Sequence, residues 1–111
     1  MAVTLKVLIP AKIAESSQTT QYTATGVTAI IDKFTATNYD TVVRSITVNL
    51  VTSGDTVGNQ NKIVVSRALQ PAETYLFPEL VGAALAPGGF ISTIASNATG
   101  LNIRASGREV T

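Results

Sequence analysis

The sequence predicts an all-β protein that folds as a single antiparallel β-sandwich of the jelly-roll or immunoglobulin-like kind. Apolar and polar residues alternate with a period of two in several short segments, which is typical of strands. Turn residues such as Gly, Asn, Asp and Ser separate these segments at short intervals. No long segment has the 3.6-residue period of an amphipathic helix, so a parallel α/β design lacks its helices. A chain of 111 residues suits one domain.

The first 14 residues are expected to form an N-terminal strand or arm, followed by the sandwich in residues 15–111, with one domain in all. Apolar residues alternate between Ala2 and Ala14, and Pro10 marks an edge or extended piece because proline has no backbone N–H to donate. Two interpretations stay open. The segment is an arm that adds to the sheet of a neighbour, or it is the first strand of its own sandwich.

Residues 28–37 and 43–51 form the clearest strands in the middle of the chain. The first is rich in β-branched residues, and Phe34 is its expected core anchor. In the second, every other residue from Arg44 to Leu50 gives a mostly apolar side, so we expect a half-buried strand. Weaker candidates lie at residues 5–9 and 21–25, and further strands are expected at residues 62–70, 74–77, 89–96 and 100–110.

The stretch ELVGAALAPGGF, residues 79–90, breaks the alternating pattern. As a helix it has about two turns between Pro78 and Pro87, and Gly82 weakens so short an element further. As a phosphate-binding loop it lacks the following Lys and Ser or Thr, and it leads into a strand instead of a helix. We favour a corner that carries the chain from one sheet to the other, with at most one short helix near residues 79–86.

The composition argues against several classes of protein. Charged residues make up 14% of the chain and hydrophobic residues 45%, and the formal net charge is +1. The charges are spread singly, so no basic stripe points to a nucleic acid. No apolar run is long enough for a membrane span. The first residues do not resemble a signal peptide, so we expect a protein made in the cytoplasm without export.

Histidine and cysteine are both absent. Their absence removes disulfides, thiolate nucleophiles and sulfur ligands, and leaves acid-base chemistry to Asp, Glu, Lys and Tyr. The acids never come at the spacing of a calcium-binding loop. Asp32 is the one considered further, because it lies in an apolar strand beside Lys33; we favour a solvent-facing or cation-paired carboxylate over a functional acid. We expect no enzyme, no metal and no cofactor.

Beyond these patterns, the chain resembles a family. The segments IPAKIAESSQTTQYTA, AIIDKFTATN, VNLV, LQPAETYLFPELVGAALAPGGFISTIAS and LNIRASGREVT, in this order, are similar to the small all-β virion proteins of tailed bacteriophages. The resemblance covers nearly the whole chain. It implies a head decoration or cement protein, or else a collar, head-tail connector or tail accessory protein, that is made in the host cytoplasm and works in the virion as a symmetric oligomer. It brings no catalytic residues.

We therefore expect a non-enzymatic structural protein that binds capsid or neck proteins and other copies of itself. A receptor- or glycan-binding module is a remoter alternative, because aromatic residues make up only 5% of the chain and the tyrosines are dispersed. The expected interface residues come from the N-terminal segment and from the last strand: Leu5, Val7, Ile9, Pro10, Arg104, Arg108 and Glu109.

Overall fold

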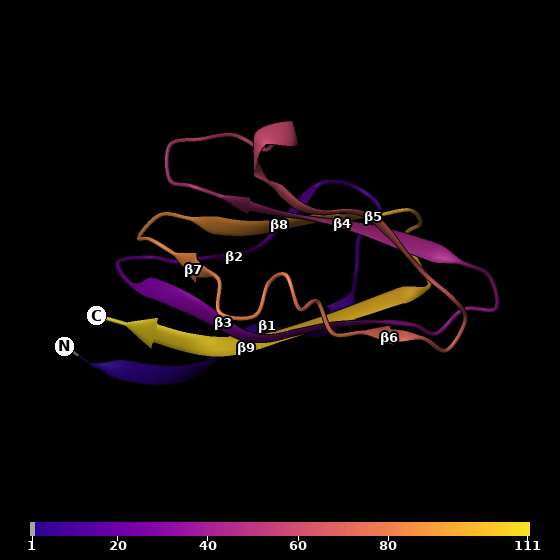
Figure 1. Cartoon of the computed structure of the whole chain (residues 1–111), viewed down its shortest axis with the longest axis horizontal. Helices are drawn as coiled ribbons and strands as arrows, with labels where there is room; N and C mark the ends of the chain where they lie inside the picture. Colours follow the sequence, from indigo (N-terminus) through magenta and orange to yellow (C-terminus); the bar gives the residue numbers. More distant parts are fainter. Residues whose placement is uncertain (1) are drawn as a thin grey trace.

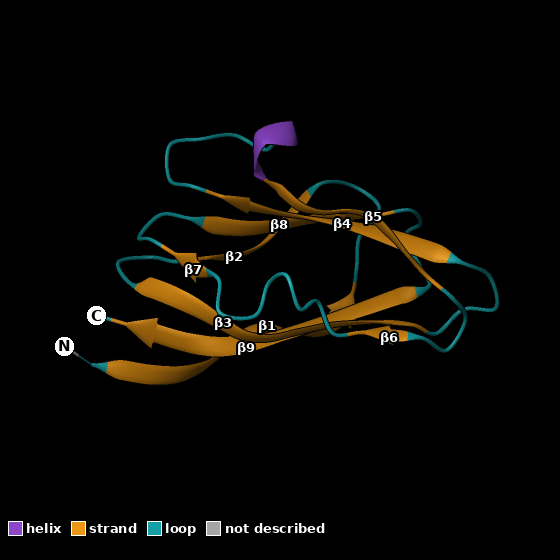
Figure 2. Cartoon of the chain, in the orientation of Figure 1, coloured by secondary structure: helices purple, strands orange, loops and turns teal. Residues whose placement is uncertain are grey.

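The computed structural model describes residues 2–111 and consists of two antiparallel sheets packed face to face (Figure 1). This confirms the predicted all-β sandwich. The strands, which Figure 2 separates from the loops, are β1 (Val3–Ile13), β2 (Thr19–Thr23), β3 (Thr28–Asn38), β4 (Arg44–Val51), β5 (Lys62–Leu69), β6 (Thr74–Tyr75), β7 (Ala84–Leu85), β8 (Phe90–Ala95) and β9 (Leu101–Val110), with a short 3-10 turn η1 (Asn59–Asn61).

One sheet holds both ends of the chain, and we call it the terminal sheet. Its strand order is β1, β9, β3, β6, and β7 also pairs with β3. The other, which we call the second sheet, has the order β2, β8, β4, β5. The chain ends lie side by side in Figure 1, because Val3 is opposite Val110 in the pairing of β1 with β9.

The N-terminal segment forms the first strand of its own sandwich. β1 runs along β9 from Val3 to Ile13, with irregularities in register after Val7 and after Ile9. Leu8, Ile9 and Ala14 are buried in the core. β1 is therefore both an edge strand and a contributor to the core.

The core lies between the two sheets and contains the predicted anchor Phe34, whose side chain is fully buried. The rings of Phe34 and Phe77 pack edge to face with their centroids 4.7 Å apart, a favoured geometry for aromatic pairs. Phe77 reaches this position from the connection after β6. The core therefore depends on a loop residue as well as on strand residues.

The expectation that β4 is half-buried is wrong, because both of its faces are covered. Ile46 and Val48 face the core, and Asn49 on the opposite face is also fully buried. The connection between β4 and β5 folds back over the second sheet, and the amide of Asn49 donates to the carbonyl of Gly58 at 3.2 Å. A loop thus covers the face that the alternation assigned to solvent.

Residues 79–89 form turns and the short strand β7, and no helix, and Phe90 begins β8. Gly82 donates its backbone N–H to the carbonyl of Ile31 at 2.7 Å, and Ala83 accepts a bond from the N–H of Ile31 at 2.9 Å. Gly82 has φ +83°, a conformation that favours glycine. The chain then passes from β7 in the terminal sheet to β8 in the second sheet. This is the corner that the sequence predicts.

Candidate functional site

The most exposed large apolar side chain of residues 2–111 lies on the outer face of the terminal sheet, near the chain ends: Leu5 of β1, which is 81% exposed. Val3 and Val7 of the same strand are exposed beside it. Leu5 is opposite Arg108 of β9, which in turn is opposite Ile30 of β3. Cross-strand partners project to the same face of a sheet, so these three strands form one continuous surface. We call it the terminal face.

Two bulges shape the terminal face. β3 has one extra residue at Asp32, between Ile31 and Lys33, and β1 has one at Leu8. The bulge in β3 lies opposite Ser106 and Gly107 of β9, and the bulge in β1 lies opposite Ser106 and Ala105. A bulge bends a strand and re-aims its side chains, which explains why Ile31 and Phe34 are both buried although they are three residues apart.

A depression of about 320 Å³ lies at this bend, lined by Leu5, Lys6, Val7, Asp32, Ser106 and Gly107. Gly107 is required by the close approach of the neighbouring strand. A Cβ atom there would lie 1.9 Å from the backbone oxygen of Ile30, well inside van der Waals contact. The bend and the depression therefore depend on a residue without a side chain.

An ion pair crosses the terminal face beside the depression. The guanidinium of Arg108 donates from Nη2 to Asp32 Oδ1 at 2.9 Å and from Nε to Asp32 Oδ2 at 3.0 Å. The hydrogen bonds to the Asp32 carboxylate raise the pKa of Arg108. About two-fifths of each side chain stays exposed. Asp32 is thus a cation-paired carboxylate, as favoured from the sequence, and its partner is the predicted interface residue Arg108.

Glu109 faces the other way, toward the space between the sheets. The hydroxyl of Tyr22 in β2 donates to Glu109 Oε2 at 2.5 Å, and Lys6 Nζ lies 3.9 Å from Glu109 Oε1. Burial raises the pKa of Tyr22, and the hydrogen bond to Glu109 adds to the effect. Glu109 therefore connects the two sheets and is only partly available to a partner.

Apart from Glu109, the predicted interface residues fall into three groups. Leu5, Val7 and Arg108 share the terminal face, whereas Pro10 and Arg104 are exposed farther along β1 and β9. Ile9 is a correction, because its side chain is fully buried in the core. The bulge at Leu8 shifts the alternation by one residue and turns Ile9 inward. Val3 and Ile30 belong to the terminal face but were not predicted.

The sequence holds a signal for each bulge of this surface. Val7, Leu8 and Ile9 are three adjacent apolar residues in an otherwise alternating strand, and such a break marks a change of face. Around Asp32, the adjacent pairs Ile30–Ile31 and Asp32–Lys33 break the alternation in the same way.

Another group of polar side chains holds the loop after β4. The loop after β4 is held by Asn61, whose Oδ1 accepts from Asn49 Nδ2 at 2.7 Å and from the backbone of Gly58. Asp55 accepts hydrogen bonds from Gln60 in the same loop.

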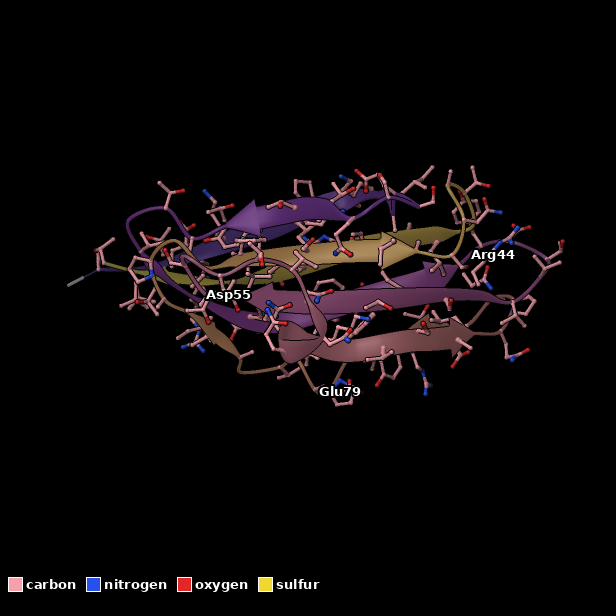
Figure 3. The ribbon with its side chains drawn as sticks, turned by 90° about the horizontal axis from the view of Figure 1, so that it is seen from above. Arg44, Asp55 and Glu79 are labelled. Atoms are coloured by element: carbon pink, nitrogen blue, oxygen red, sulfur yellow. The ribbon has the colours of Figure 1, made fainter. Side chains whose placement is uncertain are left out.

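Figure 3 places Asp55, Arg44 and Glu79 in separate parts of the molecule. Among residues 2–111 no group of three or more Asp and Glu side chains is placed to hold a metal ion.

The tyrosines do not form a shared platform. Tyr22 is turned toward Glu109, and Tyr75 is covered by the guanidinium of Arg67, 4.2 Å from its ring centre, while its hydroxyl donates to Glu79. Tyr39 is half-exposed in the connection after β3. Each ring therefore lies in its own local environment.

Comparisons with protein-family models, with curated proteins and with solved structures found no match. Within the described chain, residues 2–111, no helix has the length and apolar character needed to cross a membrane.

Proposed function

We propose that the protein is a non-enzymatic structural subunit of a tailed-phage particle, which binds other virion proteins and further copies of itself. The proposal rests on the resemblance of the sequence to small all-β virion proteins and on the terminal face. Within the particle, we favour head decoration or cement over a place at the collar, connector or tail.

The terminal face is the single observation that carries a role in assembly. Val3, Leu5 and Val7 expose apolar side chains in a row on an edge strand. Apolar surface on a soluble monomer is unfavourable in water unless a partner covers it. A rigid sheet presents such a row in a fixed geometry, which suits repeated contacts between many identical copies.

The local charges also suit a protein partner. Arg108 is balanced by Asp32, and Lys6 by Glu109. The surface therefore combines apolar side chains with paired charges of both signs, as the rims of protein interfaces do. A strongly basic or acidic surface would instead favour a nucleic acid or a cationic partner.

Quantitative mass spectrometry of purified phage particles tests the proposal. The amount of this protein is measured against the major capsid protein in separated heads and tails. Copies comparable to the capsid protein would support decoration of the shell. A few copies confined to the neck or tail would support the collar, connector or tail alternative. Absence of the protein from heads and tails alike would overturn the structural role.

A further inference from the structure

The edge of β1 that faces away from β9 has backbone groups available for pairing. Thr111 donates its backbone N–H to the carbonyl of Ala2 at 3.0 Å, so these two residues form a hydrogen-bonded pair. In an antiparallel ladder, hydrogen-bonded and non-hydrogen-bonded pairs alternate. Thr4 and Lys6 therefore bond to β9 as well. The residues between them direct their N–H and C=O groups to the free edge.

Those residues are Val3, Leu5 and Val7, whose side chains are also exposed on the terminal face. An edge of this kind is a template for another strand. The segment has a defined length, because β1 bulges at Leu8 and Pro10 has no N–H to donate. Pairing along this edge is thus confined to residues 3–7.

We propose that residues 3–7 of β1 pair in the antiparallel direction with the same residues of a second copy, around a two-fold axis at Leu5. This deepens the proposed structural role, on which it rests, by naming the surface through which two copies associate. Val3 then faces Val7 of the second copy, and Leu5 faces its own counterpart. The two terminal sheets become one continuous sheet, with the apolar side chains of both copies on one face.

The pattern of side chains selects this register. With the axis at Leu5, Lys6 lies opposite Thr4 of the second copy. An axis at Lys6 would place two ammonium groups opposite each other, which is unfavourable, and would set Val3 against Ile9, beyond the bulge. If the second copy were shifted by one residue, the free backbone groups of Val3, Leu5 and Val7 would face residues whose backbone groups already bond to β9. The chosen register pairs apolar with apolar and polar with polar residues.

A second copy also fits the charges and the shape of the terminal face. Asp32 and Arg108 neutralise each other, so two copies meet without net repulsion between like charges. The depression next to Leu5 and Val7 lies beside the proposed axis and gives space for side chains of the second copy. A partner of strong single-sign charge would gain nothing from this balanced surface.

Sedimentation equilibrium of the full chain and of Leu5→Lys tests the proposal. The unchanged chain is expected to dimerise. Leu5→Lys puts two ammonium groups together at the axis and should raise the dissociation constant at least about tenfold. Val65→Lys is the matched control, since Val65 is an exposed apolar residue on β5, an edge strand of the second sheet, and it should leave the dimer intact. Circular dichroism checks that both variants fold.

Cross-linking tests the register, because the chain has no cysteine of its own. Leu5→Cys should cross-link to itself with a bis-maleimide that spans less than about 10 Å. Val3→Cys and Val7→Cys should cross-link when mixed, but not when each is alone, because four residues of a strand separate like positions by roughly 13 Å. Leu76→Cys, at an exposed position outside this surface, should not cross-link.

A chain that is monomeric at every concentration, or a dimer that Leu5→Lys leaves unchanged, would overturn the proposed pairing. A dimer in which Val3→Cys cross-links alone would overturn the register. These failures differ from failure of the structural role, which is decided by the content of purified particles. A protein present in particles but monomeric in solution would keep that role and lose this surface.

Discussion

The hydroxyl of Tyr22 donates a 2.5 Å hydrogen bond to the carboxylate of Glu109 and thereby ties β2 of the second sheet to β9 of the terminal sheet. Lys6 approaches the same carboxylate from β1. Three strands from both layers thus meet at one acidic side chain, at the end of the sandwich where the chain begins and ends. This contact closes that end of the core.

We predict that Tyr22→Phe changes how stability depends on alkaline pH. The folded state raises the pKa of Tyr22 above its ordinary value of 10.0, so its contribution is complete below pH 10 and is lost as the pH rises above it. Urea unfolding at neutral pH and at about pH 11 should show a smaller alkaline loss for Tyr22→Phe than for the unchanged chain. Tyr39→Phe is the control, and an equal change in that variant would contradict the assignment.

Phe34→Ala should lower the free energy of unfolding by about 3–5 kcal/mol. The substitution removes a fully buried ring and its edge-to-face contact with Phe77. Phe34→Leu keeps most of the volume and should lose clearly less. Urea denaturation gives both values. A loss below about 1 kcal/mol for Phe34→Ala would show that the core can close over the missing ring.

Gly107→Ala should prevent the bend of the terminal sheet. The added methyl group would overlap the backbone oxygen of Ile30, and a backbone atom of a neighbouring strand cannot move aside cheaply. We expect loss of folded protein or a large fall in melting temperature. Gly58→Ala is the comparison, because there the nearest atom belongs to the flexible side chain of Gln60. Equal melting temperatures for the two variants would contradict the close approach at Gly107.

Ala72→Gly should stabilise the protein by up to about 1 kcal/mol. Ala72 has φ +67° in the turn after Pro71, where Glu73 donates its backbone N–H to the carbonyl of Gln70 at 3.0 Å. Glycine adopts this left-handed conformation without the strain that a Cβ atom causes. Ala68→Gly in β5 should instead destabilise, since a strand gains nothing from glycine. A lower melting temperature for Ala72→Gly would show that the positive φ of Ala72 does not strain the folded chain.

The alternation of the sequence predicts those parts of the fold that local chemistry decides. In β9, Leu101, Ile103 and Ala105 face the core as the period of two requires, and Phe34 is buried. The turn-rich segments likewise separate the strands where expected. These features depend on the polarity of each residue and on its neighbours in the chain, and a single sequence contains that information.

The features that the sequence does not predict depend on distant contacts. Asn49 is buried because the loop after β4 folds over it. The residues next to Asn49 in the sequence do not predict where that loop lies. The bulges at Leu8 and Asp32 arise from how β1 and β3 fit against β9. Those bulges decide which side chains reach the terminal face, so that Leu5 lies on it whereas Ile9, named with it as an interface residue, lies in the core.

The position of β9 also bears on how the chain folds during synthesis. β9 lies between β1 and β3 in the terminal sheet, yet the ribosome makes it after both of them. The second sheet consists of strands that are complete once β8 has emerged. One layer of the sandwich can thus assemble on the ribosome while β1 and β3 wait without their common neighbour. Until β9 leaves the exit tunnel, β1 lacks its strand partner and β3 pairs only with the short strands β6 and β7. The nascent chain therefore exposes two strand edges that chaperones would need to cover.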